Sequence, residues 1–513
     1  MGLFPINETP FQVGLADLIS PATRSDNLNY LSSPSDPNSK PPIAPSQRSD
    51  PARFLDLFPG KRLLWQAFFG SYVVGLDRLL PVAAVTCLDD GSDFDLIRDE
   101  RNIAFCSVDA MGHRRTNWVG CGIDGVFRRR GPVIQEWLGR YPKDSWLLTS
   151  SPPCPLMDTL CADLGYRYVG TPPEAIEQFK HKARLFEALD ELHLPRVRGS
   201  WRQLRNRSYE ELASEFGSDI VVQQPLGAAG AATARLRSQA DLDGLDDRFL
   251  GMDVWVAPYL GELSFNINAA VIGDLVCVGF PSVQLAGYAE LGAPWGGYCG
   301  NDYTAATETD AAIIADVQQQ TERVGEWLLS RGFEGVYGLD FVLNPGDGRA
   351  YAVDLNPRWQ GSTALSVQAE LGAGRLPLMA ALFAAQSGAL GSSDIRSLQE
   401  SFRKPIRGSQ LNLRCRSRVE STVTEPVQPG VYDLAGDLTF KRTAFRPEDL
   451  NGDEVLLTGG VPRKGMVVEP GAWLCRLVSW RSVLTPYSPR LNPWAAQAAG
   501  DLYSRFSFET AKR

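Results

Sequence analysis

The chain of 513 residues is 44% apolar and 22% charged, proportions typical of a globular protein with roughly two to four packed units. Its net charge of −9 leaves no general basic field for a phosphate backbone, which excludes nucleic acid as a main partner. The chain has three histidines in all, so a histidine-rich zinc site or a Ser/His/Asp triad is not expected.

Residues 1–52 are predicted to be a flexible tail. Six serines and six prolines lie among residues 31–51, a composition that buries too little apolar surface to offset the chain entropy. The alternative is an arm that docks on the rest of the protein through Phe4, Phe11, Val13 and Leu15.

The N-terminal segment and the cysteines together indicate a cytoplasmic protein. The N-terminus has neither a basic segment nor a long apolar one, so we expect no secretory signal. The apolar run at residues 63–76 contains Gln66 and, at about 14 residues, is too short to span a membrane. Nine cysteines are scattered without a CxxC pair, as expected of reduced thiols.

Residues 53–168 are predicted to form a first domain with an open α/β sheet. Short apolar runs at residues 82–85, 103–106 and 146–148 alternate with longer mixed segments, which is the pattern of strands separated by helices. No GxGxxG follows any of these runs, so nothing marks a dinucleotide site.

Residues 169–400 are predicted to form a second domain that mixes strands with helices. Leu185, Leu189 and Leu192 recur at helical spacing, and Pro195 ends that helix. Two further helices are expected over residues 311–331 and 376–385.

Residues 401–513 are predicted to form a small β-rich domain. Strand-like stretches punctuated by Gly and Pro occur at residues 410–418, 430–442 and 455–480. The fold class expected for the whole chain is therefore α/β, with α+β character towards the C-terminus.

The clearest local signal is a predicted hairpin. The segments GLDF (residues 338–341) and AVDLNPRWQGS (residues 352–362) are separated by the turn sequence NPGDG, so Asp340 and Asp354 should lie across from each other on two antiparallel strands. Asn356 is two residues beyond Asp354 and shares its face. Two carboxylates and an amide oxygen are ligands suited to Mg²⁺ bound against phosphates.

Arg358 lies two residues further along the same face. Its planar, permanent charge suits an anionic phosphoryl or acyl-phosphate centre. An ordinary surface hairpin, with solvated acids and Arg358 paired to one of them, is the alternative interpretation of these residues.

The order of these elements resembles the ATP-grasp superfamily over about residues 165–390, after a first domain similar to the family's usual N-terminal (pre-ATP-grasp) unit. In that family two subdomains clamp ATP, and the last strands end in an (E/D)xNxR signature. The resemblance implies Asp340, Asp354 and Asn356 as ligands of Mg²⁺, or of Mn²⁺ in its place, and Arg358 as the catalytic residue that stabilises the transferred phosphoryl group. Gln360 and Ser362 would line the acceptor pocket.

The resemblance also assigns residues to ATP. Lys182 matches the lysine that opens the family's first helix and reaches the nucleotide phosphates, and the strand–loop–strand segment 219–236, with Gly227 and Gly230, is similar to the loop that covers the triphosphate. Where the family has a second lysine this chain has Gln224, and no other lysine occurs between Lys182 and Lys404. Arg235 or Arg237 could supply the missing charge.

The segment 256–271 is similar to the family's adenine hinge. By resemblance the backbone of Pro258 and Leu260 would meet the adenine edge, Tyr259 would lie beside the base, and Glu262 would bind the ribose hydroxyls. The glycine-rich loop at residues 292–303 is a candidate lid or specificity element for the substrate, with Trp295 and Tyr298 as its contact residues.

The family implies a ligase that uses ATP and magnesium to make an acyl phosphate, which an amine then attacks to form an amide. Gln224, the tail and the additional C-terminal domain look most like amino-acid and peptide ligases of microbial specialised metabolism. Alternatives are a biotin-type carboxylase, a purine-pathway ligase and a regulatory module that binds nucleotide without catalysis. We expect amino acids or peptides as substrates, a homodimer as one possible assembly, and neither nucleic acid nor membrane as partner.

Overall fold

The computed structural model describes residues 51–117, 131–151, 155–227, 229–434, 437–485 and 488–511. The predicted tail and its possible docking residues lie outside this part, except that residues 51 and 52 begin the short helix α1 (Pro51–Phe54). In the described residues no helix is long and apolar enough to cross a membrane.

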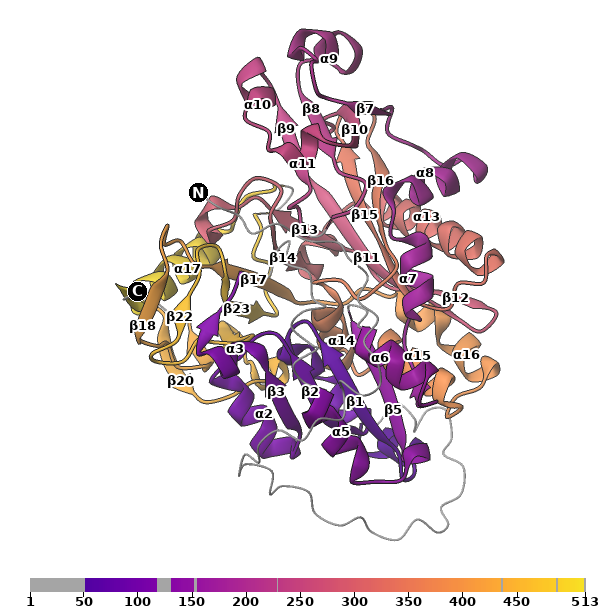
Figure 1. Ribbon diagram of the computed structural model, residues 1–513, viewed down its shortest axis with the longest axis vertical. Helices are drawn as coiled ribbons and strands as arrows, with labels where there is room; N and C mark the ends of the chain where they lie inside the picture. The colour runs from indigo at the N-terminus through magenta and orange to yellow at the C-terminus, as the bar shows by residue number, and fades with distance from the viewer. Residues whose placement is uncertain are drawn as a thin grey trace.

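The first domain is a five-stranded sheet in the order β3-β2-β1-β5-β6 with every pairing parallel (Figure 1). Each residue of β5 is buried, because helices cover both faces of such a sheet and its strands read as continuous apolar runs. The predicted open α/β sheet is therefore confirmed. The elements are η3 (Leu55–Leu57), β1 (Arg62–Ala67), η4 (Gly70–Val73), η5 (Leu76–Arg78), β2 (Val82–Cys87), α2 (Asp93–Arg101), β3 (Ala104–Ser107), α3 (Val108–Gly112), β4 (Arg114–Arg115), α5 (Gly131–Gly139), η7 (Lys143–Ser145), β5 (Trp146–Ser151), α6 (Pro155–Ala162) and β6 (Arg167–Tyr168).

A small lobe projects from the top of the molecule in Figure 1. Its antiparallel sheet has the order β7-β10-β8-β9 and its own apolar core, which includes Leu212, Val222 and Val254. Helices α7 (Pro173–Phe179) and α8 (Lys182–Glu191) lead into it, and α8 ends before Pro195 as predicted. The lobe consists of β7 (Ser200–Gln203), α9 (Tyr209–Phe216), β8 (Ile220–Gln223), β9 (Thr233–Leu236), α10 (Gln239–Asp243), α11 (Asp247–Leu250) and β10 (Asp253–Pro258).

The largest sheet has eleven strands in the order β16-β15-β11-β13-β14-β17-β23-β21-β19-β20, with β12 paired to β11. The long helix α13 (Ala311–Ser330) matches the predicted 311–331, and α15 (Leu378–Ser387) starts two residues later than predicted. The strands are β11 (Ser264–Ile272), β12 (Leu275–Val278), β13 (Ser282–Ala286), β14 (Tyr298–Asp302), β15 (Gly335–Asn344), β16 (Arg349–Asn356), β17 (Ser409–Arg414), β19 (Gly430–Asp433), β20 (Thr439–Arg442), β21 (Glu454–Thr458) and β23 (Trp473–Ser479). The other helices along these strands are η8 (Ala289–Leu291), α12 (Tyr303–Ala306), α14 (Thr363–Gly372), α16 (Ser392–Arg403) and η9 (Pro447–Asp449).

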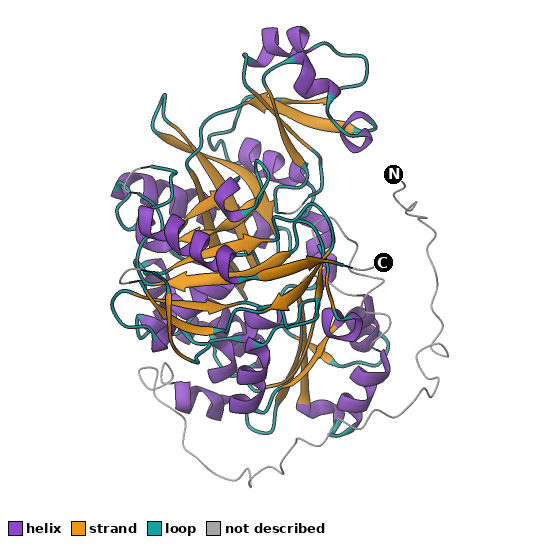
Figure 2. Ribbon diagram, turned by 90° about the vertical axis from the view of Figure 1, so that its left-hand side faces the viewer, coloured by secondary structure: helices purple, strands orange, loops and turns teal. Residues whose placement is uncertain are grey.

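The C-terminal residues are rich in strands, as expected, and they continue the central sheet. Strand β17 pairs antiparallel with β14, so the sheet runs without interruption across the predicted boundary between residues 400 and 401. A further four-stranded sheet has the order β24-β18-β22-β4 and includes β4, which belongs to the N-terminal part of the chain. It contains β18 (Ser421–Glu425), β22 (Val467–Val468) and β24 (Ser507–Thr510), with α17 (Pro493–Arg505) nearby. Figure 2 shows the small lobe standing apart from these larger sheets. The boundaries of the predicted domains stay a prediction.

Polar contacts tie the first domain to the C-terminal strands. The buried carboxylate of Asp93 accepts hydrogen bonds from the backbone N–H groups of Gly459, Gly460 and Val461 and from the hydroxyl of Thr458. Buried carboxylates need such partners, because a lost hydrogen bond costs the full desolvation of the group. Since these elements are held together, side chains from both can contribute to one site.

Candidate functional site

The predicted hairpin is present, and it places the two acids side by side. Strands β15 and β16 pair antiparallel, with Asp340 opposite Asp354 and Gly338 opposite Asn356. A β-bulge follows Asp340, and bulges commonly aim side chains at the ends of strands. The sequence spacing therefore predicted this geometry correctly.

Asp340 is held by amides and lies next to a second negative charge. The Nδ2 atom of Asn266, on the neighbouring strand β11, donates to Asp340 Oδ1 at 2.5 Å, and Asn356 Nδ2 approaches Oδ2 at 3.4 Å. Burial and then the Asp354 carboxylate raise the pKa of Asp340 to about 6. A divalent cation placed here would remove this repulsion, as metal ions do between paired carboxylates.

The donor set has the chemistry of a magnesium site that shares its ion with a phosphate. In the described residues no group of three or more His, Cys, Asp or Glu side chains is arranged to bind a metal ion. The donors at the hairpin are two carboxylates and one amide. Mg²⁺ commonly uses one or two protein carboxylates and completes its octahedron with water and phosphate oxygens. In this structure Asn356 Oδ1 accepts a hydrogen bond from Arg358 Nη2 at 3.0 Å.

Lys182 reaches this hairpin from the first turn of α8. Its side chain is 6% exposed and its Nζ lies 2.6 Å from Asp354 Oδ1. Its backbone N–H donates to Pro225 O at 3.1 Å, and His181 caps the helix by accepting from the N–H of Ala183. The predicted phosphate lysine therefore meets both the acids and the glycine-rich segment.

Gln224 precedes a loop whose Gly227 lines the same cleft. The Nε2 atom of Gln224 is buried and has no hydrogen-bond partner among the described residues, whereas its backbone N–H bonds to Ala232 O. Gly230 has φ +81°, and a Cβ there would lie 1.9 Å from Gly296 O. The loop thus touches the segment that carries Trp295, and only glycine fits at this contact.

Arg235 lies towards the predicted adenine hinge. Its Nε donates to Asp219 Oδ1 at 2.7 Å, and the guanidinium lies 3.6 Å from the centre of the Tyr259 ring. Pro258 ends β10, the Tyr259 N–H donates to Asp219 O, Leu260 is half-buried, and Glu262 is exposed. Arg237 is exposed, and its backbone N–H bonds to Asp241.

The two candidate substrate residues of the lid loop have different surroundings. Trp295 is 41% exposed, and its ring centre lies 6.5 Å from that of Tyr259. Tyr298 is buried: its hydroxyl accepts from Gln410 Nε2 at 2.9 Å and donates to Asn301. Trp295 therefore lies near Tyr259 of the predicted adenine hinge. Tyr298 packs against the segment that contains Gly361, where an added Cβ would lie 2.4 Å from the Tyr298 ring.

Gln360 and Ser362 are held by two asparagines of β11 that the sequence analysis did not select. Gln360 Oε1 accepts from Asn266 Nδ2 at 2.6 Å, and Asn268 Nδ2 donates to Ser362 Oγ at 2.9 Å. The signal was present in the sequence, since Asn266 and Asn268 are polar residues two apart in a mostly apolar strand and so share a face. This amide network joins the acids to the predicted acceptor residues.

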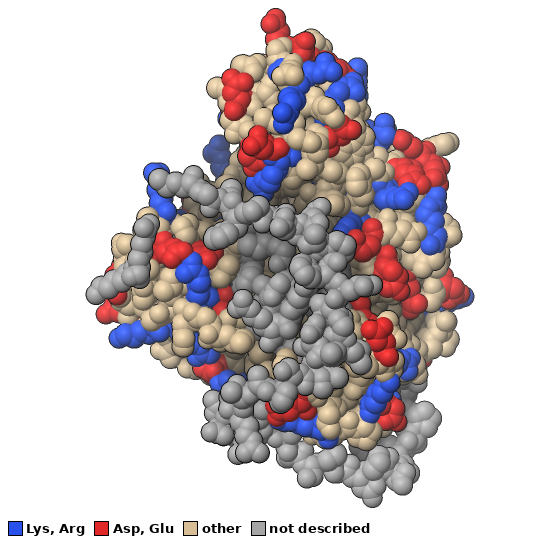
Figure 3. Space-filling view, in the orientation of Figure 1, with Lys and Arg blue, Asp and Glu red and all other residues tan. Residues whose placement is uncertain are grey.

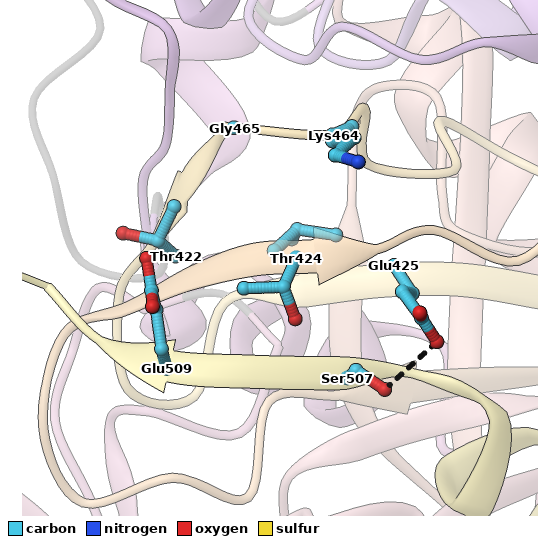
Figure 4. A pocket seen from close by; sticks show the side chains of 8 residues that line it. Thr422, Thr424, Glu425, Lys464, Gly465, Ser507 and Glu509 are labelled. Carbon is cyan, nitrogen blue, oxygen red and sulfur yellow. Dashed lines mark hydrogen bonds between the residues drawn. The ribbon is translucent and has the colours of Figure 1, made fainter.

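The cleft at the hairpin is small, with a volume of about 30 Å³, and its lining includes Lys182, Gly227, Asp354 and Arg358. A larger hollow of about 480 Å³ lies on the outer sheet between β18, β24 and the residues before β22 (Figure 4). Its lining includes threonines, Glu425, Lys464, Ser507 and Glu509. Among its described lining residues there is neither a pair of facing aspartates nor a glycine-containing loop like the one at the hairpin cleft. Chemistry, rather than volume, therefore identifies the hairpin cleft as the candidate site.

Comparisons with known proteins agree on the fold. No known family model matches the chain. The large chain of carbamoyl phosphate synthase from Deinococcus radiodurans is 27% identical over 205 residues, which are 38% of this chain and 19% of that protein. The chain thus matches about a fifth of the length of this curated relative.

Two solved structures extend the likeness to most of the chain. A biotin carboxylase in complex with β,γ-ATP, from Campylobacter jejuni, has a TM-score of 0.56 and 13% identity, covering 88% of this chain and 92% of that one. The biotin carboxylase domain dimer of 2-oxoglutarate carboxylase from Hydrogenobacter thermophilus, with MgADP and bicarbonate, has a TM-score of 0.54 and 13% identity, covering 82% and 86%. With its parallel N-terminal sheet, small antiparallel lobe and large antiparallel sheet, the chain has the ATP-grasp fold.

Proposed function

We propose that the protein is an ATP- and magnesium-dependent ligase that activates a carboxylate as an acyl phosphate and transfers the acyl group to an amine. The observation that carries this proposal is the convergence of Lys182, Asp340, Asp354 and Arg358 on one cleft below a glycine-containing loop. A module that only bound nucleotide would have no need for paired acids and an arginine at the phosphate end.

The chain's own residues suit each part of this reaction. Lys182 and the loop around Gly227 and Gly230 would bind the phosphates, with the Gln224 amide as a further donor. Asp340, Asp354 and Asn356 would hold Mg²⁺, which neutralises the charge of the transferred phosphoryl group. Arg358 would stabilise that charge as the carboxylate oxygen attacks, and a closed cleft would keep water from the acyl phosphate.

The proposed partners are small molecules. On the face seen in Figure 3 the acidic and basic side chains of the described residues alternate, and the net charge is −9, so this surface offers no continuous field for a polyanion. The similar domain from Hydrogenobacter thermophilus is a dimer, which supports testing this protein for a homodimer.

A second candidate is a carboxylase-type enzyme that activates bicarbonate. The two similar structures favour it, since one holds bicarbonate with MgADP and both are biotin carboxylases. Amino-acid or peptide ligation, which the sequence alone favoured, has no such support from the comparisons. Gln224 in place of a second lysine departs from the usual ATP-grasp pattern, and by resemblance this departure favours the amino-acid and peptide ligases.

One screen decides between these candidates. ADP release by the purified full-length protein is measured with Mg-ATP and pools of amino acids or dipeptides, each with and without bicarbonate, and products are identified by mass spectrometry. Turnover that depends on a carboxylate and an amine, and is lost in Asp354→Asn, supports the ligase. Turnover that requires only bicarbonate supports the carboxylase, and ATP binding without turnover in any pool supports the non-catalytic module.

A further inference from the structure

A buried arginine without a carboxylate partner lies beyond the phosphate end of the cleft. Arg476, on β23, is 5% exposed. No carboxylate of the described residues forms an ion pair with it, although the buried carboxylate of Asp89 lies within its electrostatic reach. Its Nε has no hydrogen-bond partner there. A guanidinium that is removed from water in this way is costly unless an anion compensates it.

Aromatic rings surround this charge on several sides. The guanidinium carbon lies 5.3 Å from the ring centre of Phe69, 5.0 Å from that of Tyr72 and 5.9 Å from that of Trp473. Phe69 and Trp473 stack at 4.5 Å. Such rings stabilise a cation partly and form an apolar wall, but they offer no negative charge.

Further unsatisfied polar groups lie beside Arg476. Asn412 is directly opposite it in the register of β17 and β23, and both amide atoms of Asn412 are buried without a partner in the described residues. The indole N–H of Trp473 is also without one. We call Phe69, Tyr72, Asn412, Trp473 and Arg476 the Arg476 cluster. Buried donors left open together are typical of a site completed by a ligand or ordered water.

The Arg476 cluster is connected to the reacting end of the cleft. Gln410 shares a face of β17 with Asn412, since the two are two residues apart, and Gln410 Nε2 donates to Gly361 O at 2.9 Å, between Gln360 and Ser362. Burial raises the pKa of Tyr72, while Arg476 and Arg358 act to lower it, so Tyr72 lies within the electrostatic reach of both guanidiniums.

We propose that the Arg476 cluster binds a second carboxylate, one that does not receive the phosphoryl group, and that the amine substrate is therefore a free α-amino acid. This inference rests on the proposed ligase function. Mg²⁺ and Arg358 would hold the reacting carboxylate. Burial raises the pKa of Asp89 to about 7, which weakens its negative charge near neutral pH, so Arg476 is left to pair with a separate anion. An amino acid whose carboxylate pairs with Arg476 directs its amine towards the acyl phosphate, while the rings pack against its carbon atoms.

The test compares free amino acids with the corresponding amino-acid carboxamides as acceptors. In the parent protein, kcat/KM should be about tenfold or more lower with the carboxamide, which lacks the charge-assisted pair. Arg476→Gln should lower kcat/KM for the amino acid about tenfold or more and reduce this discrimination, with KM for ATP nearly unchanged. The matched control is Arg481→Gln, because Arg481 is an exposed arginine of the same segment that pairs with Asp453.

A second variant separates substrate binding from a purely structural role. Asn412→Asp places a carboxylate opposite Arg476, which should raise the melting temperature or leave it unchanged, yet raise KM for the amino acid by competing for the guanidinium. If Arg476 serves only packing, Asn412→Asp leaves KM unchanged and Arg476→Gln reduces turnover equally with both acceptors. Either result overturns the inference. It is also overturned if kcat/KM of the parent protein is the same for carboxamides and for amino acids.

A binding measurement distinguishes this inference from the proposed function. Thermal shifts are recorded with each free amino acid in the presence of a non-hydrolysable ATP analogue and Mg²⁺. A thermal shift with an amino acid that is lost in Arg476→Gln supports the amino-acid site. If such a shift occurs without turnover, the proposed ligase reaction is wrong but the proposed amino-acid site is supported. Absence of any shift and of any amino-acid-dependent turnover overturns the site itself.

Discussion

Lys182 Nζ and Asp354 Oδ1 lie 2.6 Å apart across the cleft, so the predicted phosphate lysine is paired with a predicted metal ligand. This contact satisfies a lysine whose side chain is 6% exposed, and a buried ammonium needs such a partner. The ion pair therefore holds both side chains at the cleft. If Mg-ATP binds in the proposed manner, Lys182 would pair with the phosphates and Asp354 would coordinate the metal, in place of their mutual ion pair.

Replacement of Lys182 should affect nucleotide and metal in opposite directions. Lys182→Ala should weaken ATP binding about tenfold or more, because a charge-assisted phosphate contact is lost. The same change should strengthen binding of Mg²⁺ alone, since Asp354 no longer pairs with an ammonium. Calorimetric titrations with ATP and with MgCl₂ measure both effects, and Arg184→Ala is the control because Arg184 lies exposed on the same helix. Parallel weakening of both ligands would contradict this exchange.

Arg358→Ala should lower kcat about 10²-fold or more at saturating Mg-ATP, because it removes fixed charge at the reacting phosphoryl group. The melting temperature should change little, since the hydrogen bonds that Arg358 donates go to its near neighbours Trp359 O and Asn356 Oδ1. Steady-state kinetics and a thermal scan measure the two properties. Arg349→Ala, at the exposed turn of the same hairpin, should behave like the parent. A near-normal kcat in Arg358→Ala would place the reaction elsewhere.

Gln224→Ala should weaken ATP binding more than Arg235→Ala does. The sequence alone made Arg235 or Arg237 the candidates for the missing charge, but Arg235 pairs with Asp219 and lies on Tyr259, whereas Gln224 Nε2 is buried and open within the part of the chain that the structure describes. A donor without a partner gains most from a phosphate oxygen. Calorimetry with ATP compares the three alanine variants, and a larger loss in either arginine variant would restore the arginine hypothesis.

Gly230→Ala should displace the phosphate loop and weaken ATP binding. A Cβ at this position would lie 1.9 Å from Gly296 O, and the residue has φ +81°. Gly273→Ala is a matched control, because Gly273 also has a positive φ, of +60°, but no atom of the described residues lies within 4 Å of its added Cβ. Both variants carry backbone strain, so a difference in ATP affinity between them reports the contact with Gly296. Equal affinities would show that this contact does not matter.

The sequence predicted the hairpin well because its information is local. Asp340, Asp354 and their turn lie within one short segment, so strand alternation and turn chemistry fix their relation. The same holds for Lys182, which is placed by the start of a strongly patterned helix.

Long-range pairing was beyond such reasoning. Gln410 meets Tyr298 across 112 positions of sequence, and Arg476 meets Phe69 and Tyr72 from another domain. Neither contact has a local pattern. The sequence analysis missed the continuation of the central sheet into β17 for the same reason, because the composition of a strand does not predict which strand it pairs with.

Asp93→Ala should destabilise the protein by about 3 kcal/mol or more, because it leaves several buried backbone N–H groups without an acceptor. These groups belong to residues 459–461, so the junction of the first domain with the C-terminal strands should loosen first. Urea unfolding measures the free energy, and hydrogen exchange at residues 458–461 locates the effect. Asp99→Ala is the control, since the Asp99 side chain is 77% exposed. Similar losses in both variants would contradict a specific role for Asp93.

Isotope transfer tests the central claim most directly. The carboxylate substrate found in the screen is labelled with ¹⁸O in both oxygens, and the products are analysed by mass spectrometry after turnover with Mg-ATP. Because the carboxylate oxygen attacks the γ-phosphoryl group, each turnover should release ADP and an inorganic phosphate that carries one ¹⁸O atom. Release of AMP that carries the label, or of phosphate without it, would contradict the acyl-phosphate mechanism at the hairpin cleft.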